Sequence, residues 1–232
     1  MKASVGIIKK LITVSAICFV LLALAACGEE PNAKFKNANV GDYITFGSYE
    51  QDNNTANGKE AIEWLVLAKD GDKALVISRF ALDCQPFDPS DLEVTWETCS
   101  LRKWLNGTFI NNAFSPEEQD IIQNSTVTAD VNLEYSTLPC NDTTDKVFLL
   151  SITEAESYFH NDEERKCVPT YYAMAQGTWI KEGDVNCIWW LRSPGYSDLY
   201  YYATFVYVEG FTNSAPADLE SVGVRPAMWI EL

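Results

Sequence analysis

The clearest local structure is predicted at residues 62 to 78, which read IEWLVLAKDGDKALVIS. Two apolar runs, residues 64–67 and 74–77, stand on either side of Asp70 and Gly71. Because this pair tolerates a backbone with positive φ, the pattern is typical of two antiparallel strands joined by a tight turn. The sequence therefore predicts a β-hairpin near the start of the folded part of the chain.

Short helices are expected after the hairpin, and capping residues mark where they begin. Ser100 can cap a helix over residues 101–105, with Gly107 placed to end it. The tetrads at 115–118 and 151–154 both combine a serine cap with a glutamate that can reach back to it. The predicted helices therefore cover residues 101–105, 116–122, 151–159 and 170–176.

The last third of the chain is rich in strand-forming residues separated by Gly and Pro. Strands are predicted over residues 187–192, 200–208 and 222–230, and a further strand over 146–150 leads into the third helix. The order is strands, then short helices, then strands, whereas a doubly wound α/β domain would alternate the two throughout. The predicted fold class is therefore α+β.

The N-terminus has the three parts of a bacterial lipoprotein signal. Lys2, Lys9 and Lys10 precede an uncharged run at 11–26, which ends in small residues before Cys27. A basic start is retained at the inner membrane face, an apolar run partitions into the bilayer, and small residues admit a peptidase. An uncleaved membrane helix is disfavoured, because spanning the hydrocarbon takes about 20 apolar residues.

These features predict a signal peptide at residues 1–26, a lipidated stalk at 27–40 and one folded domain at 41–232. The lipid is expected on Cys27, so the membrane is an expected partner and the domain lies outside the cytoplasm, anchored to the bacterial cell membrane. The stalk is polar and lacks apolar periodicity, which suits a spacer. A hydrophobic content of 47% is ample for a packed core in a domain of about 200 residues.

The chain is strongly acidic, with a formal net charge of -16. Loss of residues 1–26 removes three lysines and no acid, which leaves -19. A surface of this sign repels nucleic acid, which is bound by clustered Lys and Arg. Nucleic acid is therefore excluded as a partner.

Five cysteines follow Cys27, an odd number in a compartment where disulfides persist. At least one thiol must stay unpaired. Proximity favours pairing Cys84 with Cys99 and Cys167 with Cys187, although spacing alone does not fix connectivity. Buried free cysteines are the alternative.

Enzymatic patterns are weak in this sequence. The single histidine, His160, follows a predicted helix, where its charge can interact favourably with the helix C-terminal dipole. No nucleophile is marked for Ser-His-Asp or Cys-His catalysis. Paired carboxylates of a glycosidase could exist among the 33 acids, but the sequence selects no pair. No catalytic residue and no cofactor are therefore predicted.

Metal-binding patterns are equally weak. Zinc is disfavoured, because the chain has no Cys-x-x-Cys pair and no second histidine. Residues 52–58 resemble a calcium loop, but their glycine falls seventh rather than sixth, so a polar turn is predicted. An acidic run could supply oxygen ligands for calcium, although such runs are more often a solvated face. Its members are Asp83, Asp88, Asp91, Glu93 and Glu97.

Two C-terminal motifs carry a family resemblance. They are WWLRSPG at 189–195 and GVRPA at 223–227, and further matches run through residues 41–47, 96–106 and 145–151. With these motifs the chain resembles an uncharacterised bacterial lipoprotein domain family. The resemblance covers nearly all of residues 40–232.

The C-terminal part is also similar to the C-type-lectin-like fold, which formylglycine-generating enzymes share. This resemblance implies a small, twisted antiparallel C-terminal sheet that holds loops at one surface. Calcium-dependent sugar-binding members carry Glu-Pro-Asn or Gln-Pro-Asp, whereas this chain has QPFD at 85–88, so calcium-bridged sugar binding is not implied. Nothing ties Cys167 or Cys187 to the cysteines of the formylglycine-generating enzymes, so that activity is not carried over.

Aromatic residues and an arginine in the C-terminal third are candidates for ligand binding, since flat rings stack on sugars and anchor protein partners. On a strand, Trp189 and Trp190 point to opposite faces, so one is expected in the core and the other on an exposed or loop-covered face. For Arg192 and Arg225, partly buried structural ion pairs are favoured over a ligand role. The candidate ligand-binding residues are Trp190, Arg192, Tyr200 and Tyr202.

The leading interpretation is a surface-anchored lipoprotein with a non-catalytic, C-type-lectin-like binding domain. Its loops at 83–97 and 193–220 would contact a glycan or a protein. One alternative is an extracytoplasmic glycan-acting hydrolase that uses paired carboxylates. Another is a structural envelope protein. A deep cleft with two facing carboxylates would favour the hydrolase, and a shallow aromatic-lined surface would favour binding.

Substitution Cys27→Ser should move the protein from the membrane fraction to the soluble fraction, because it removes the acceptor of the lipid. Cell fractionation with immunodetection measures this shift. Cys140→Ser serves as the control, since that cysteine lies in the folded domain. Persistence of the Cys27→Ser protein in the membrane fraction would contradict lipidation.

Overall fold

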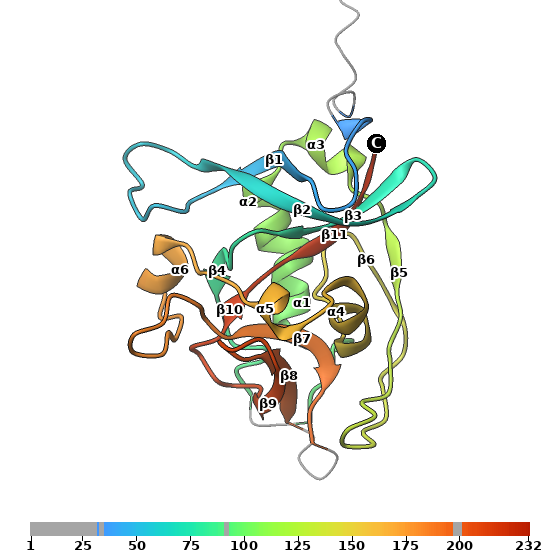
Figure 1. The fold of residues 1–232 in the computed structure, drawn as a ribbon, viewed down its shortest axis with the longest axis vertical. Coiled ribbons are helices and arrows are strands. Elements are labelled where there is room, and N and C mark those ends of the chain that lie inside the picture. The colour runs from blue at the N-terminus through green and yellow to red at the C-terminus, as the bar shows by residue number, and fades with distance from the viewer. Residues whose placement is uncertain (1–31, 33–34, 91–92, 197–200) are drawn as a thin grey trace, which may run out of the picture.

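The computed structural model describes Asn32 and residues 35–90, 93–196 and 201–232. The signal peptide, Cys27 and Tyr200 lie outside the described residues. The architecture is α+β, as predicted, with two main sheets, a two-stranded ribbon and short helices (Figure 1). Among the described residues, no helix is long and apolar enough to cross a membrane.

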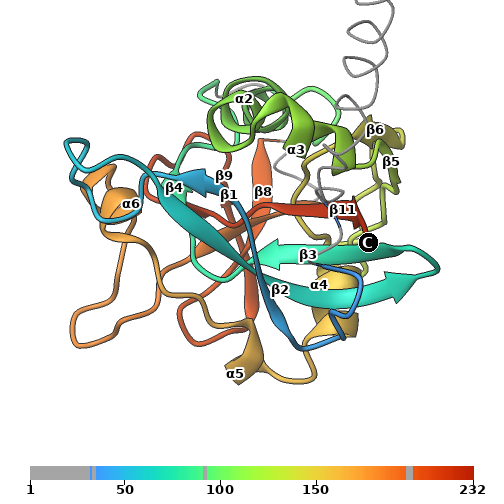
Figure 2. The ribbon, with the colours of Figure 1, turned by 90° about the horizontal axis from the view of Figure 1, so that it is seen from above.

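The first sheet is built around the predicted hairpin. Strands β2 (Glu60–Asp70) and β3 (Lys73–Ser78) pair antiparallel, and Gly71 in the turn has a φ of 60°. Strand β1 (Tyr43–Tyr49) flanks β2, and β11 (Ala227–Glu231) flanks β3. The last strand of the chain therefore completes the N-terminal sheet, with β11 beside β3 in the view from above (Figure 2).

The second sheet has the strand order β4-β10-β7-β8-β9. Strands β7, β8 and β9 are antiparallel, but β10 pairs with β7 in parallel. The implied antiparallel C-terminal sheet is therefore confirmed for β7, β8 and β9, and the β10–β7 pair is a parallel exception. These strands are β4 (Asp83–Cys84), β7 (Trp189–Pro194), β8 (Tyr202–Val206), β9 (Thr212–Pro216) and β10 (Gly223–Val224).

The predicted strand at 222–230 is divided between the two sheets. Its first part is β10 and its second part is β11, and Pro226 lies between them. Proline has no N–H to donate to a continuous ladder, so the chain leaves one sheet there and enters the other.

The first predicted helix is longer than expected. Helix α1 (Ser100–Trp104) continues through a π-helical turn, η2 (Leu105–Phe109), into α2 (Ile110–Ala113). Gly107 lies inside this helical run and does not end it, because Leu105 and Phe109 are buried on either side of it. Burial of two large side chains outweighs the cost of about 1 kcal/mol for a glycine within a helix.

The cap of α1 is Cys99 rather than Ser100. The Cys99 sulfur accepts a hydrogen bond from the Arg102 backbone N–H at 3.4 Å. The Ser100 backbone N–H is instead bound by the Asp88 carboxylate at 2.9 Å. The hydrogen bond from the distant Asp88 to Ser100 N–H therefore determines which residue caps α1.

The other predicted helices are confirmed. Both expected capping boxes are present, Ser115 with Glu118 and Ser151 with Glu154. Asn161 caps one further short helix that the sequence did not predict. These helices are α3 (Pro116–Ile121), α4 (Ile152–Tyr158), α5 (Asp162–Arg165) and α6 (Tyr171–Ala175, capped by Thr170).

The predicted strand at 146–150 is wrong. The ribbon strands are β5 (Ser125–Val127) and β6 (Thr143–Asp145), and in 146–150 only Phe148 makes a β-bridge, to Ala227. The Asn106 side-chain oxygen accepts the N–H groups of Lys146 and Val147, each at 3.0 Å. Because a side chain satisfies these donors, the buried segment needs no neighbouring strand.

Strand β7 is buried on both faces. Trp189 and Trp190 are each 0% exposed, and their indole N–H groups donate to Arg165 O and Gln85 O at 3.0 Å. The Trp190 ring lies 5.7 Å from the Phe87 ring. Neither tryptophan is exposed, and of the two expected alternatives the loop-covered face describes Trp190, which packs beneath the segment of Gln85 and Phe87.

Substitution of Trp189 or Trp190 by alanine should lower the free energy of unfolding by about 3 to 5 kcal/mol, since each removes a large buried side chain. Urea titration followed by circular dichroism measures the loss. Trp179→Ala is the matched control, because Trp179 is 39% exposed and should cost far less. Equal losses for all three variants would contradict the burial of β7.

The two sheets are joined by a buried hydrogen bond. The Tyr49 hydroxyl at the end of β1 donates to the Asp83 carboxylate on β4. Burial raises the pKa of Asp83, although the hydrogen bonds from Tyr49, Gln85 and the Cys84 N–H oppose that effect. Ionisation of Asp83 therefore opposes folding.

Substitution Asp83→Asn should change how stability depends on pH. The pKa of Asp83 is higher in the folded protein than in the unfolded protein. Its contribution to the free energy of unfolding is therefore complete below the ordinary Asp pKa of about 3.9, and it is lost as pH rises through the folded pKa. The unfolding free energy of the unsubstituted protein minus that of Asp83→Asn should therefore fall as pH rises. Denaturant titrations at several pH values test this.

Asp88→Asn should give the opposite trend. Burial raises the pKa of Asp88, but hydrogen bonds from Ser90 and the Ser100 N–H outweigh this effect and lower it. The contribution of Asp88 to the free energy of unfolding is therefore lost as pH falls. If the unfolding free energies of the two variants changed with pH in the same direction relative to the unsubstituted protein, burial of Asp83 would not control its ionisation.

Candidate functional site

A small inner cavity and an open groove adjoin one another where β7 ends and β8 begins. Both are lined by Val94, Thr95, Pro139, Pro194 and Tyr202. The inner cavity has a volume of about 20 Å³, which is room for a water molecule, and the open groove has about 430 Å³. We call the open part the three-loop groove, defined by residues 93–95, 136–139 and 194–196 with Tyr202.

The inner cavity is held by the buried side chain of Arg192. Its guanidinium forms a bidentate ion pair with Glu154 on α4, and it donates to Leu149 O at 2.8 Å and Thr128 O at 3.0 Å. Arg192 is 4% exposed. Its donors therefore serve the buried structural ion pair, the role favoured from the sequence over ligand binding.

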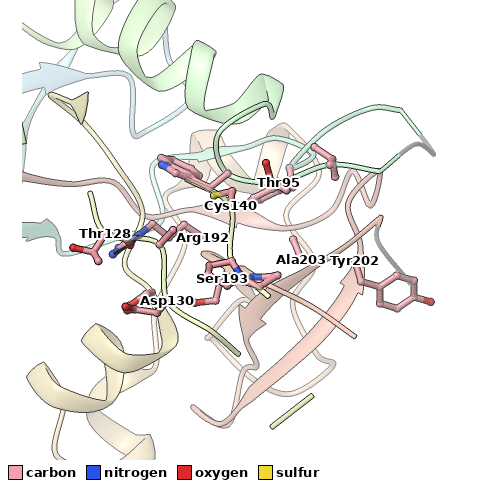
Figure 3. Close-up of a pocket in the computed structure, with 15 residues that line it drawn as sticks. Thr95, Thr128, Asp130, Cys140, Arg192, Ser193, Tyr202 and Ala203 are labelled. Carbon is pink, nitrogen blue, oxygen red and sulfur yellow. Dashed lines mark hydrogen bonds between the residues drawn. The ribbon is translucent and has the colours of Figure 1, made fainter. Parts of the chain in front are cut away.

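The side chains around the inner cavity point in different directions (Figure 3). Arg192 points toward Thr128, whereas the Tyr202 ring points away from it, toward the outside. Ser151 donates to the Asp130 carboxylate at 3.1 Å, and the Ser193 hydroxyl accepts the Ile152 N–H at 3.0 Å. The polar groups at the cavity thus hold the loops onto β7 and α4.

Cys140 lines the same cavity as a half-buried free thiol. A nucleophilic cysteine needs a neighbouring base, which is most often histidine. The chain's single histidine, His160, has a side chain that is 85% exposed and contacts Glu164 at 3.2 Å instead. The cavity therefore does not assemble Cys-His catalysis.

The three-loop groove carries an aromatic cluster. The Tyr196 ring lies 4.1 Å from Tyr135 and 5.8 Å from Tyr202, and Tyr201 lies 5.1 Å from Tyr202. Tyr196 is 38% exposed and Leu138 is 78% exposed, so apolar surface faces solvent here. Aromatic surface beside an open groove is the usual basis of ligand contact.

The loops of the groove are tied to one another by hydrogen bonds. Asn132 donates to Pro194 O at 2.7 Å, and Thr137 donates to Gly195 O at 2.5 Å. The Asn132 side-chain oxygen also accepts the Glu134 N–H at 3.1 Å. Because the loops are held before any ligand arrives, binding there costs less ordering entropy.

The predicted ligand-binding residues do not share one surface. Arg192 and Tyr202 line the inner cavity, Trp190 is fully buried, and Tyr200 lies outside the described residues. The sequence did not identify Tyr135 and Tyr196. Their only signal was an aromatic side chain within a polar, turn-rich stretch.

The predicted disulfides are absent from the structure. All five described cysteines are free thiols. Cys84 contacts Glu220 O at 3.0 Å, whereas Cys99 caps α1, so the two thiols serve different parts of the fold. Cys167 and Cys187 are neighbours, and the Cys187 N–H donates to Cys167 O at 2.8 Å. The alternative of buried free cysteines therefore holds for four of the five, and Cys140 is half-buried.

The acidic run at 83–97 does not gather around one point. Asp83 binds Tyr49, Asp88 binds Ser90 and Ser100, and Glu97 binds Asn141. Each of these three carboxylates therefore has its own partner in the fold. Asp91 lies outside the described residues.

A different acidic cluster forms at the end of the β1–β2 hairpin. Carboxylate oxygens of Glu50, Asp52 and Glu60 lie within 4.8 Å of one another. Backbone amides already donate to them, from Asn54 to Glu50 at 2.8 Å and from Gln51 to Glu60 at 2.7 Å. Such oxygens suit a divalent cation, and here they also organise the polar turn that the sequence predicted.

Comparison with known proteins identifies a family but no individual curated relative. No curated protein and no solved structure matches the chain. A family model, described as a domain of unknown function (DUF6273), matches residues 71–232. This match includes β3 and β11 of the first sheet, the whole second sheet and the three-loop groove, and it agrees with the resemblance seen in the C-terminal motifs. The chain therefore belongs to the DUF6273 family.

Proposed function

We propose that this protein is a lipid-anchored, non-catalytic binding protein of the bacterial cell surface, and that its ligand occupies the three-loop groove. The N-terminal signal and Cys27 support the anchor. The observation that carries the binding role is the aromatic cluster of exposed Tyr196 with half-buried Tyr135 and Tyr202 beside a groove of about 430 Å³.

The ligand class that this groove favours is a glycan. A sugar ring offers an apolar C–H face to an aromatic ring and hydroxyl groups to polar side chains. The groove provides tyrosine rings together with the Glu93 carboxylate and the Thr95 and Ser136 hydroxyls. A chain of net charge -16 repels anions, so a neutral or amine-bearing glycan fits better than an acidic one.

We also propose that the scaffold is C-type-lectin-like. Support comes from the antiparallel strands β7, β8 and β9, which hold loops at one surface. The motif at 189–195 contains β7, and the motif at 223–227 begins with β10, which pairs with β7. In this arrangement the sheet supplies rigidity and the loops supply the contacts.

The hydrolase alternative would need two carboxylates facing the same bond, about 5 to 9 Å apart. Glu93 and Asp130 are the acidic residues that line the groove and the inner cavity. Asp130 accepts a hydrogen bond from Ser151, and its cavity holds about 20 Å³. This favours binding over hydrolysis. The exposed Tyr196 and Leu138 count against a purely structural envelope protein, because such surface usually marks an interaction site.

Substitution Tyr196→Ala should weaken glycan binding about fivefold or more, because truncating an aromatic anchor costs above about 1 kcal/mol. Isothermal titration of the full-length protein in detergent, against neutral and amine-bearing oligosaccharides and soluble wall fragments, measures the change. Tyr171→Ala is the matched control, since Tyr171 on α6 is 70% exposed and does not line the groove.

Analysis of the oligosaccharides after incubation separates binding from hydrolysis. Intact glycan is expected with the unsubstituted protein. Cleavage that disappears in both Glu93→Gln and Asp130→Asn would establish the hydrolase instead. Equal binding by the Tyr196→Ala and unsubstituted proteins would exclude the groove as the site.

A further inference from the structure

A cavity of about 520 Å³ lies beside helix α6 and shares no lining residue with the three-loop groove. Its wall is formed by Phe80, by residues 51–52 at the end of the β1–β2 hairpin, and by residues within 168–174 and 180–185. Figure 1 shows α6 between the end of this hairpin and the loop that follows the helix. We call this cavity the α6 pocket.

Apolar side chains form most of the wall of the α6 pocket. Two of them face solvent, since Tyr171 is 70% exposed and Val185 is 67% exposed. An apolar cavity of about 300 to 1,000 Å³ is the usual form of a small-molecule site. An apolar ligand would therefore remove exposed hydrophobic surface from water. The apolar side chains are Phe80, Val168, Tyr171, Met174, Ile180 and Val185.

Backbone hydrogen bonds hold the wall in place. Ala81 N–H donates to Val168 O at 3.1 Å, and Thr170 N–H donates to Ala81 O at 3.0 Å. Tyr172 N–H on α6 donates to Gln51 O at 3.0 Å, which ties the helix to the end of the hairpin. Because these segments are fixed to one another without a ligand, binding in the pocket costs little ordering entropy.

The charges on the wall of the α6 pocket are negative. Asp52 and Asp184 line it, and no lysine or arginine does so among the described residues. The hydrogen bond from the Asn57 side chain lowers the pKa of Asp52. Hydrogen bonds from the backbone N–H groups of Asn186 and Val185 lower the pKa of Asp184. Both carboxylates are therefore ionised at neutral pH.

Asp184 has one carboxylate oxygen without a hydrogen bond in the described part of the chain. Its Oδ1 accepts the Val185 N–H at 2.7 Å, and it also accepts the Asn186 N–H at 3.0 Å and the Asn186 side-chain amide at 2.9 Å. The charge of Lys166 acts on Asp184, but the Lys166 ammonium is paired with Glu163 at 2.6 Å. Oδ2 of half-buried Asp184 is therefore available to a cation in the pocket.

We propose that the α6 pocket binds a small apolar amine, whose hydrophobic body lies against Phe80 and Met174 and whose ammonium group pairs with Asp184. Carboxylates of Glu50 and Glu60 lie within 4.8 Å of that of Asp52, so the negative potential at the pocket is reinforced from the hairpin. This potential attracts an apolar cation and repels an apolar anion such as a fatty acid. The site is separate from the proposed glycan site and does not depend on it.

Isothermal titration of the full-length protein in detergent tests this pocket, with 3-phenylpropylammonium as the probe and a detergent blank to correct for its partition into micelles. The ammonium should bind saturably. 3-Phenylpropanol has the same apolar body without the charge, and it should bind about fivefold more weakly or worse because it lacks the ion pair. 3-Phenylpropanoate carries a negative charge and should bind most weakly of the three.

Substitution Asp184→Asn should lower the affinity for the ammonium to that for the alcohol and leave the affinity for the alcohol unchanged. The asparagine oxygen can still accept the N–H groups of Val185 and Asn186, so the loop is retained. Glu182→Gln is the matched control, because it removes the same charge from an exposed residue of this loop that does not line the pocket.

Two further variants locate the ligand. Tyr171→Ala removes part of the apolar wall but no charge, so it should weaken binding of the ammonium and of the alcohol by the same factor. Tyr196→Ala lies at the three-loop groove and should leave the affinity for the ammonium unchanged.

Absence of saturable ammonium binding, or equal affinities for the three compounds, would overturn the proposal. An unchanged ammonium affinity in Asp184→Asn, or an equal loss in Glu182→Gln, would overturn the role of Asp184. A loss in Tyr196→Ala without one in Tyr171→Ala would place the amine in the three-loop groove instead. If Asp184→Asn fails to fold, the three compounds compared on the unsubstituted protein decide the charge preference by themselves.

Discussion

Burial of strand β7 is the constraint on which the rest of the structure depends. The strand crosses the interior with Trp189 and Trp190 on opposite faces, both fully covered. Every polar group carried into that interior must find a partner, because an unsatisfied buried donor costs about 1 to 3 kcal/mol. The indole groups find Arg165 O and Gln85 O, so α5 and the segment after β4 are fixed by the same strand.

Arg192 extends this constraint to the candidate site. Its guanidinium reaches Thr128 and, in a second stretch that leads into α4, Leu149 and Glu154. These contacts place the N-terminus of α4 and the loop around Thr128 against the strand. The three-loop groove opens where this buried network ends and solvent begins. Arg192, in the motif at 189–195, therefore supports the loops beside the groove without lining the groove itself.

The two arginines of the C-terminal motifs solve the same physical problem differently. Arg192 is neutralised by a carboxylate and by backbone carbonyls, whereas Arg225 lies near the Trp189 and Phe159 rings and donates to Ser78 O. Arg192 therefore links β7 to α4, and Arg225 links the segment between β10 and β11 to the end of β3.

The sequence by itself determined the local structure of this protein. The hairpin turn at Asp70 and Gly71 and the capping boxes at Ser115 and Ser151 depend on residues at most a few positions apart, so their patterns could be read directly. Tertiary structure decided the features that depend on distant partners. Asp88 contacts Ser100 and leaves the α1 cap to Cys99, β11 joins β3 from the far end of the chain, and packing on both faces buries Trp190. The groove also depends on tertiary structure. Tyr135 and Tyr196 are distant in sequence and come into contact only when Asn132 and Thr137 bind the end of β7.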